Sequence, residues 1–526
     1  MTQSINAPWP DASAPLRERL AQLMFVRIGS NLPPVRTVEE DEDRIAQLLD
    51  VIPLGGLVLF NGTHANTPQT LARLQQRSRY PLLVSADLER GAGQQLRSYP
   101  LFPHAMAFDA LGPGAAEAVY KFAELTGQTA RAAGVHINFG PVADVNSDPR
   151  NPIISTRAFA TEPRRVAELA AQFVRGCTAA GLLSAAKHFP GHGNTHEDSH
   201  HALPTVDATW EEIARRELPP FQATIAAGVP LVMTAHVRYP TLDPTGAAAT
   251  LSRPILTDLL REQLGFTGAV VSDSLLMEGV KIGCANEGEL ALKALNAGVD
   301  ILLDVAEPLT TLEALEAAVK TGHLSEARVN EALAHVGQLK SAVFTSDYGA
   351  PPYNESENRR QTESLAVDIA HRAIVLPKNE GALLPFSAGR SMCAILVNPF
   401  PLPSNADHPP LGVYLKKRFT NVSYYELGAD PSDAQLAEIR HTALATEQLL
   451  AAFVVKPAAW HRFGLPPKLR DWLQGLAASR PTVAACLGAP QGLEPLSAAA
   501  AHLCTFSDVP VSQRALVDRL LPPTAV

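Results

Sequence analysis

Histidines recur at every fourth residue of one polar segment, at positions 188, 192, 196 and 200 of the stretch Lys187–His201 (KHFPGHGNTHEDSHH). On a helix this spacing would place the four imidazoles on one face. Pro190, Gly191 and Gly193 interrupt the stretch, however, and both residue types break helix interiors. We therefore expect a loop, and a loop this rich in titratable side chains is more typical of a functional site than of a simple connection.

Two kinds of chemistry fit this loop. His196, Glu197 and His200 match the HExxH pattern of zinc proteases, but that pattern binds its metal from a helix. Pro190–Gly193 and Pro204 flank the segment, so we expect no metal here. The alternative is acid–base chemistry without metal, because an imidazole has a solution pKa of about 6.5. Asp198 would then fix the tautomer of His200 and stabilise its imidazolium form.

A second carboxylate completes this chemistry. Asp273 comes two residues after the apolar run Ala269–Val271, and at that place it would stay ionised. Such a group can attack an electrophilic carbon or stabilise a developing cation. Cleavage of a glycoside through an oxocarbenium-like transition state needs one proton donor and one carboxylate. His200 and Asp273 would supply these two parts with no cofactor.

Eight short apolar runs alternate with amphipathic stretches between residues 20 and 305, which is typical of buried parallel strands separated by helices. Eight such strands over about 300 residues predict a (β/α)8 TIM-like barrel. The runs are Phe25–Ile28, Gly56–Phe60, Leu82–Ala86, Val135–Phe139, Leu183–Ala186, Leu231–Ala235, Ala269–Val271 and Val299–Leu303.

Polar residues follow these runs repeatedly, at Asp87, Asn138, Lys187–His188, His236, Asp273 and Asp304. Functional residues of such barrels gather at the carboxyl ends of the strands. Strands also end wherever polarity begins, but that alone does not explain why the polar residue is so often Asp, Lys or His. We therefore expect the site at this mouth of the barrel.

A second α/β alternation follows the barrel. The boundaries that we expect are residues 1–345 for the barrel, 346–365 for a polar linker with Pro351–Pro352, and 366–526 for a smaller α/β sandwich. Its candidate strands are Ala373–Leu376, Cys393–Val397, Val422–Tyr425, Ala451–Val455, Val483–Leu487 and Leu503–Phe506.

Composition excludes several classes of protein. Of the 526 residues, 46% are hydrophobic and 18% charged, as in ordinary globular proteins, and the net charge of −9 argues against a nucleic-acid partner. No apolar window is long enough to span a membrane, and the first residues do not resemble a signal peptide. Five scattered cysteines suit a reducing compartment, so we expect a cytoplasmic monomer or homodimer.

The motifs KHFPGHG, the Asp198–Ser199–His200 that follows it, and SDSLLMEG at Ser272–Gly279 resemble glycoside hydrolase family 3. The branch that they resemble most is that of the β-N-acetylglucosaminidases, from about residue 15 to 345. The resemblance implies a two-domain enzyme that releases terminal β-linked N-acetylglucosamine with retention of configuration. Its carbohydrate substrates would be peptidoglycan fragments.

The resemblance also implies a role for each matching residue. Asp273 would be the nucleophile, His200 the acid/base and Asp198 its partner. Lys187, His188, Arg157 and Asp87 would bind sugar hydroxyls. Apart from the resemblance, we expect Met277 to pack against the sugar or the barrel wall, and His236 either to bind substrate or to be structural. His192 is expected to hold the loop.

The chain departs from the family pattern at two places. Ala92 and Gln95 replace arginines of the pattern DxEGGRVQR, which leaves the peptidoglycan specificity in doubt. Ser274 stands where a second aspartate is commoner, so a neighbouring charge is absent. A β-glucosidase or broad β-glycosidase, a β-N-acetylglucosaminide phosphorylase and a catalytically silent sugar-binding protein therefore stay open as alternatives.

Overall fold

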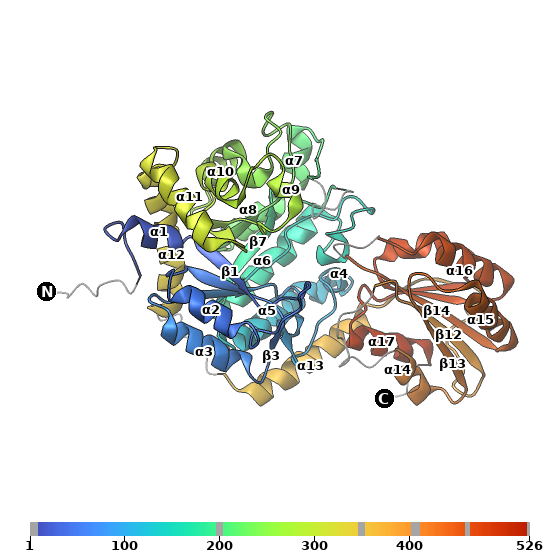
Figure 1. Ribbon diagram of the computed structural model, residues 1–526. Helices are drawn as coiled ribbons and strands as arrows, with labels where there is room; N and C mark the ends of the chain where they lie inside the picture. Colours follow the sequence, from blue (N-terminus) through green and yellow to red (C-terminus); the bar gives the residue numbers. More distant parts are fainter. Residues whose placement is uncertain (1–8, 196–202, 346–352, 401–410, 458–462, 523–526) are drawn as a thin grey trace. The chain divides into compact units, whose positions relative to one another are not determined.

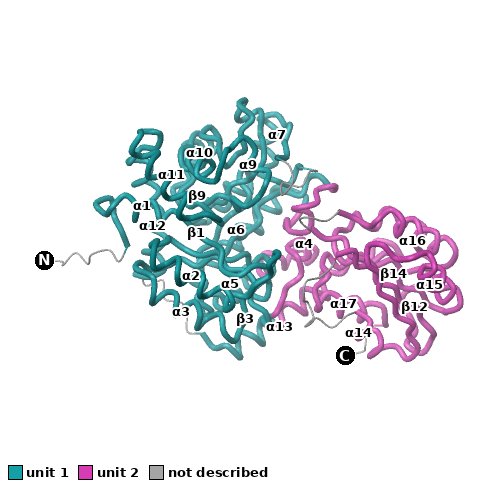
Figure 2. Tube along the Cα trace, viewed as in Figure 1, with its two compact units in different colours: residues 1–99, 119–148, 161–362 teal, residues 100–118, 149–160, 363–526 magenta. Residues whose placement is uncertain are grey.

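The computed structural model describes residues 9–195, 203–345, 353–400, 411–457 and 463–522. Residues group by their spatial contacts into two compact units (Figure 2). Unit 1 consists of residues 1–99, 119–148 and 161–362, and unit 2 of residues 100–118, 149–160 and 363–526. Each unit has its own sheet.

Unit 1 contains an eight-stranded parallel barrel (Figure 1). The strand order is β10-β1-β2-β4-β6-β7-β8-β9, and a parallel bridge between Val271 and Ile301 joins the two ends of this order. The strands are β1 (Met24–Ile28), β2 (Gly56–Leu59), β4 (Leu83–Ala86), β6 (Ile137–Asn138), β7 (Leu183–Phe189), β8 (Leu231–Thr234), β9 (Ala269–Val271) and β10 (Leu302–Leu303). The expected TIM-like barrel is confirmed, since each apolar run overlaps one of these strands.

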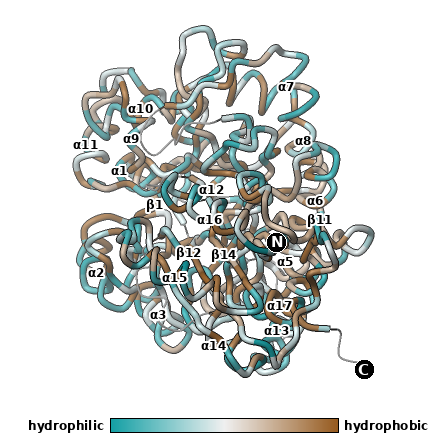
Figure 3. Tube along the Cα trace, turned by 90° about the vertical axis from the view of Figure 1, so that its right-hand side faces the viewer, coloured by the Kyte–Doolittle hydropathy of each residue, from teal (hydrophilic) through white to brown (hydrophobic). Residues whose placement is uncertain are grey.

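Helices connect the strands of the barrel. They are α1 (Leu16–Ala21), α2 (Glu42–Leu49), α3 (Thr67–Arg77), α5 (Ala115–Ala132), α6 (Pro163–Ala179), α7 (Trp210–Arg216), α8 (Leu218–Ala226), η5 (Pro254–Gln263), α9 (Glu278–Lys281), α10 (Glu287–Ala297), α11 (Pro308–Lys320) and α12 (Glu326–Phe344). Hydrophobic and hydrophilic residues mix along them (Figure 3) because each buries only one face. A short two-stranded sheet of β3 (Gly62–Thr63) and β5 (Leu96–Arg97) accompanies the barrel.

Local signals in the sequence begin several of these helices. The Thr209 hydroxyl accepts from the backbone N–H of Glu212, whose carboxylate accepts from the backbone N–H of Thr209, a capping box at the start of α7. At the start of α12 the Ser325 hydroxyl accepts from the backbone N–H of Arg328, a simple N-cap without the reciprocal bond. No described helix combines the length and the apolar composition needed to cross a lipid bilayer.

Unit 2 contains a six-stranded sheet in the order β11-β16-β15-β14-β12-β13, with β11 antiparallel to its neighbour and the other pairs parallel. The strands are β11 (Val375–Asn379), β12 (Met392–Val397), β13 (Val422–Leu427), β14 (Gln448–Val455), β15 (Val483–Gly488) and β16 (Ala501–Cys504). Its helices include α4 (Met106–Asp109), α14 (Leu411–Arg418), α15 (Asp433–Ala445), α16 (Pro467–Ser479) and α17 (Pro510–Leu520). The second α/β sheet that the sequence predicts is thus present.

The two units do not follow the three consecutive segments (1–345, 346–365 and 366–526) that the sequence led us to expect. Helix α13 (Glu355–Arg372) occupies much of the segment 346–365 that we expected to be a linker. The segments 100–118 and 149–160, which lie within the barrel sequence, belong by their contacts to unit 2. In unit 2 His104 Nδ1 lies 3.0 Å from Ser507 Oγ, and Gln491 Nε2 donates to Pro149 O at 2.8 Å. Such long-range partners leave no local pattern in the sequence.

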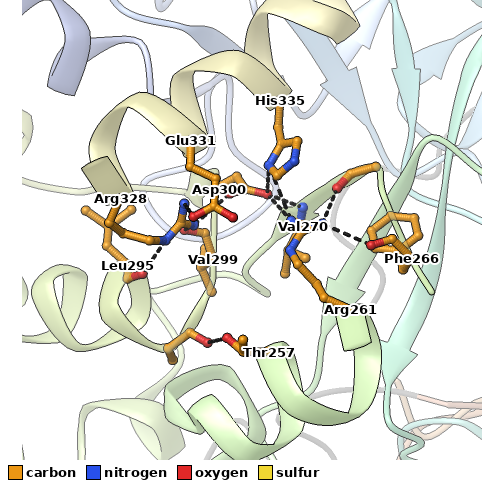
Figure 4. A network of polar contacts seen from close by, with 12 residues as sticks. Thr257, Arg261, Phe266, Val270, Leu295, Val299, Asp300, Arg328, Glu331 and His335 are labelled. Carbon is orange, nitrogen blue, oxygen red and sulfur yellow. Dashed lines mark hydrogen bonds and ion pairs between the residues drawn. The ribbon is translucent and has the colours of Figure 1, made fainter. Parts of the chain in front are cut away.

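A buried carboxylate organises the start of the last barrel strand (Figure 4). Asp300 is fully buried, and its oxygens accept from Arg261 Nη2 at 2.6 Å and Arg328 Nη2 at 2.7 Å. They also accept from the backbone N–H of Val270 at 2.8 Å, and His335 Nδ1 lies at 3.0 Å. Burial alone would raise the pKa of Asp300, but the bond from His335 and the charges of Arg328 and Arg261 hold it below its usual value.

We expect Asp300→Asn to lower the free energy of unfolding by about 3 kcal/mol or more, because two guanidinium groups lose a buried partner. The pKa of Asp300 is lower in the folded state, so its contribution is present above the unfolded pKa and lost as the pH falls through the folded pKa. The difference between wild type and variant should therefore shrink on acidification. Asp258→Asn, which breaks the exposed Arg253–Asp258 pair, is the matched control and should cost less than about 1 kcal/mol in denaturant titrations. Equal effects of the two variants would contradict the stabilising role of Asp300.

Candidate active site

Asp273 lies just beyond β9, at the carboxyl end of the barrel strands. The backbone N–H of Ser274 donates to its Oδ1 at 2.7 Å. The side chain keeps partial access to solvent although protein surrounds it, as expected for a residue that lines a recess. Burial acts to raise the pKa of Asp273, but His188, His236 and Lys187, together with the Ser274 N–H, hold it below its usual value. Asp273 is therefore an anion at neutral pH.

Lys187 lies in β7 and joins two carboxylates that follow β4. Its Nζ donates to Asp87 Oδ1 at 2.7 Å and pairs with Glu89 Oε1 at 2.6 Å, while only 2% of its side chain is exposed. Asp87 keeps 28% of its side chain exposed and Glu89 12%. This part of the mouth therefore offers a fixed cation between carboxylate acceptors, a combination that can bind hydroxyl groups as donors and as acceptors.

Asp144 holds the segment that follows Lys187. Its carboxylate accepts from the backbone N–H of His188 at 3.2 Å, from His188 Nδ1 at 2.7 Å and from the backbone N–H of His192 at 2.6 Å. Because Nδ1 is engaged, the other ring nitrogen of His188, Nε2, is the one left to contact a ligand. Burial would raise the pKa of Asp144, but the charge and hydrogen bonds of His188 keep it low.

Two glycines shape the turn between His188 and the following polar segment. At Gly191 the φ angle is +145°, and a Cβ there would lie 2.5 Å from Glu217 Oε2. At Gly193 a Cβ would lie 1.7 Å from the carbonyl oxygen of Val145. Tyr239 Oη donates to Gly191 O at 2.6 Å. Larger residues would displace the backbone, so the glycines of KHFPGHG serve close packing rather than flexibility.

The structure leaves part of the predicted site undescribed. Asp198 and His200 lie outside the described residues, so their predicted roles stay predictions. Arg157 lies in the short helix η3 (Ser155–Arg157) of unit 2, where its Nη1 donates to Ile153 O at 3.0 Å. Asp87, Lys187, His188, Met277, His236 and Asp273 all belong to unit 1. Of these, Asp87 contacts Lys187, and His188, His236 and Lys187 act electrostatically on Asp273.

His236 and Met277 both contact the carbonyl oxygen of Ser274, the residue that follows Asp273. His236 is fully buried, with Nε2 3.0 Å from Ser274 O and Nδ1 2.8 Å from Thr250 Oγ1. A carbonyl only accepts, so Nε2 carries a proton and donates to Ser274 O. Met277 is 7% exposed, and its backbone N–H donates to Ser274 O at 3.2 Å. His236 therefore has a structural part to play here, which the sequence left open.

Sequence reasoning missed two residues of this cluster. Glu89 stands two positions after Asp87, and alternate residues of an extended segment point the same way, so this signal was present. Asp144 is separated from the apolar run of β6 by Gly140–Pro141, which hid its relation to that strand. Among the described residues, no group of three or more His, Cys, Asp or Glu side chains is arranged to hold a metal ion.

The protein is similar in sequence to one family of glycoside hydrolases and to individual enzymes named for hexosaminidase activity. Residues 15–339 match the model of the glycosyl hydrolase family 3 N-terminal domain. The chain is 33% identical over 371 residues to beta-hexosaminidase A of Pseudoalteromonas piscicida, covering 64% of this chain and 62% of that protein. It is 30% identical over 366 residues to a beta-N-acetylglucosaminidase/beta-glucosidase of Cellulomonas fimi, covering 67% of this chain and 64% of that protein. The alignments thus span less than two thirds of the length of these relatives.

A solved structure resembles the protein along nearly its whole length. It is a glycoside hydrolase family 3 beta-N-acetylglucosaminidase from Paenibacillus sp. str. FPU-7, with a TM-score of 0.85 and 30% sequence identity, and the match covers 98% of both chains. The family model accounts for more than half of the sequence, and this structure extends the likeness through both units. The chain belongs to glycosyl hydrolase family 3.

Proposed function

We propose that the protein is a retaining exo-β-N-acetylglucosaminidase that hydrolyses terminal β-linked N-acetylglucosamine. The observation that carries this proposal is the ionised Asp273, partly open to solvent within the mouth of a barrel beside a cation and several acceptors. Relatives named for hexosaminidase or N-acetylglucosaminidase activity support it. Muropeptide fragments are the substrates that we infer, from the family resemblance alone.

In the proposed mechanism Asp273 is the nucleophile and His200 is the acid and base. An oxygen of Asp273 attacks the anomeric carbon and forms a covalent bond to it, while the bond to the leaving oxygen breaks and its electron pair departs with that oxygen. His200, oriented by Asp198, gives the leaving oxygen a proton. The neutral His200 then removes a proton from water, which displaces Asp273 from the sugar with a second inversion. No cofactor takes part.

The remaining residues would bind the sugar. Asp87, with a partly exposed carboxylate, accepts from hydroxyls, and Lys187 and His188 donate to hydroxyl oxygens. Arg157, which belongs to unit 2, is proposed as a sugar-binding residue from the family resemblance alone. Met277 and His236 support the segment beneath the reacting carbon. All five cysteines are free thiols, which agrees with a reducing compartment and with the cytoplasmic location that we propose.

A β-glucosidase activity is the second candidate. The relative from Cellulomonas fimi carries both activities in its name, and it matches two thirds of this chain. The residues around Asp273 would contact features that both sugars share, since none of the described contacts is specific for an acetamido group. The rates on an aryl N-acetylglucosaminide and an aryl glucoside distinguish the two activities.

Replacing Asp273 by Ala should reduce kcat/KM roughly 10⁴-fold or more while the protein stays folded, because the variant lacks the carboxylate that we propose forms the covalent intermediate. Incubation of the wild type with a fluorinated N-acetylglucosaminide, followed by peptide mass mapping, should place the sugar on the peptide that contains Asp273. The control is Asp243→Asn, which removes another buried aspartate of unit 1 from its Ser252 partner. Substantial activity of Asp273→Ala, or an adduct on another peptide, would exclude the proposed nucleophile.

His200→Ala should slow substrates with poor leaving groups far more than activated aryl glycosides, because the latter need little protonation. The slope of log kcat/KM against leaving-group pKa measures this difference. His196→Ala is the matched control from the same segment, and we expect it to keep the wild-type slope. If both variants lost all activity and bound zinc was lost with it, the HExxH alternative would replace the acid–base assignment.

Aryl N-acetylglucosaminide should be hydrolysed faster than aryl glucoside, and free N-acetylglucosamine should be the product in phosphate buffer as in other buffers. Rates and products on both substrates, measured with and without inorganic phosphate, check this. Equal rates would favour a broad β-glycosidase. A sugar 1-phosphate as the main product would identify a phosphorylase.

A further inference from the structure

Ser274, the residue after the proposed nucleophile, uses its N–H, its carbonyl and its hydroxyl in three hydrogen bonds to three different residues. Its backbone N–H donates to Asp273 Oδ1 at 2.7 Å, and its carbonyl accepts from His236 Nε2 at 3.0 Å. Its hydroxyl donates to Asp304 Oδ2 at 2.7 Å. The first contact orients the Asp273 carboxylate directly, and the other two fix the position of the group that does so.

Asp304 is itself fixed by Arg27 in the neighbouring strand. Arg27 Nε donates to Asp304 Oδ1 at 2.9 Å, and Arg27 Nη2 pairs with Oδ2. The guanidinium carbon of Arg27 lies 4.3 Å from the centre of the Phe60 ring, so a flat face supports the pair. The Asp304 side chain is only 3% exposed, and its φ angle is +67°. A bidentate pair of this kind has one preferred geometry, which makes it a rigid anchor for the Ser274 hydroxyl.

The contacts thus form a chain across the ends of three strands. It runs from Arg27 in β1 through Asp304 after β10 to Ser274 and Asp273 after β9. Asp273 Oδ2 accepts no hydrogen bond from the residues that the structure describes, whereas Oδ1 is engaged by the Ser274 N–H. The two oxygens of the nucleophile are therefore not equivalent.

We propose that Ser274 is a positioning residue of the reaction: anchored by the Arg27–Asp304 pair, it binds Oδ1 of Asp273 and leaves Oδ2 as the oxygen that attacks the sugar. This inference rests on the proposed role of Asp273 as nucleophile. Oδ2 forms the bond to the anomeric carbon, the leaving oxygen departs with the electron pair and takes a proton, and Oδ1 keeps its bond to the Ser274 N–H throughout.

The anchor also explains which residue can stand at position 274. Asp304 already receives two N–H groups from Arg27, and its Oδ2 takes the Ser274 hydroxyl as a further donor. An aspartate at 274, the commoner residue of the family pattern, would bring a second carboxylate against Asp304, which is paired with a single guanidinium, that of Arg27. Like charges at this distance repel, and the repulsion acts on the backbone that orients Asp273.

Kinetics of variants test the inference. We expect Ser274→Ala to lower kcat/KM about tenfold, below the roughly hundredfold loss that 1 Å of misplacement can cause, and to act mainly on kcat. The acid limb of the pH profile of kcat/KM should move to higher pH, because a looser Ser274 N–H stabilises ionised Asp273 less.

Ser274→Asp should lower kcat/KM more than Ser274→Ala does. The double variant Ser274→Asp/Asp304→Asn should recover activity relative to Ser274→Asp, because Asn can donate to the new carboxylate and tolerates a positive φ.

Ser252→Ala is the matched control. Ser252 is a buried serine of the same unit whose hydroxyl donates to the Asp243 carboxylate at 2.6 Å. It should lose thermal stability to a similar extent, with kcat and the acid limb as in the wild type. The inference is overturned if Ser274→Ala keeps the wild-type kcat and pH profile, or if the double variant is no better than Ser274→Asp. Substantial activity of Asp273→Ala would instead overturn the proposed function, so the two failures are distinguishable.

Discussion

One buried anion, Asp144, sets the shape of the segment on which the proposed chemistry depends. Its carboxylate receives the backbone N–H groups of His188 and His192 and the Nδ1 of His188. These bonds hold the beginning of the histidine-rich segment against the residues that follow β6, beside the Lys187 that bridges Asp87 and Glu89. The position from which the chain sets out toward Asp198 and His200 is therefore fixed by a single side chain in the barrel.

The same principle recurs at Asp273, the nucleophile that we propose, and at the opposite end of the barrel strands. Asp273 and Asp300 are both carboxylates whose burial would favour the neutral form, yet neighbouring cationic groups keep both ionised. Their surroundings differ in one respect that decides their roles. The oxygens of Asp300 interact with Arg261, Arg328, His335 and a backbone N–H, and the side chain is buried from solvent. Asp273 keeps an oxygen without such a partner among the described residues and keeps partial solvent access. An anion that is fully satisfied stabilises the fold, whereas one that is partly satisfied can react.

The fold was predictable from the sequence because its signal is local. Each barrel strand is an apolar run, as in Gly56–Phe60 or Leu231–Ala235, and buried parallel strands require such runs. The location of the site followed from the polar residues that end those runs. The bonds between these residues were not predictable, because Arg27 and Asp304 or Lys187 and Glu89 lie far apart in the chain and no spacing relates them. Ser274 was visible only as a departure from a family pattern, and the positioning role that we propose for it rests on the hydrogen bond from its hydroxyl to Asp304.

The composition of unit 2 from three stretches of chain limits how this protein can be rearranged. The chain passes from one unit to the other after residues 99, 118, 148, 160 and 362, so no single breakpoint separates a complete barrel from a complete sandwich. A fragment ending at residue 362 would retain Phe108 and Phe159, which are buried in the whole protein and pack edge to face, but would lack Ser507 and Gln491, which bind the same two stretches. An exchange of the C-terminal third alone would replace the residues that bind segments 100–118 and 149–160, so an exchange that keeps unit 2 intact must include all three stretches.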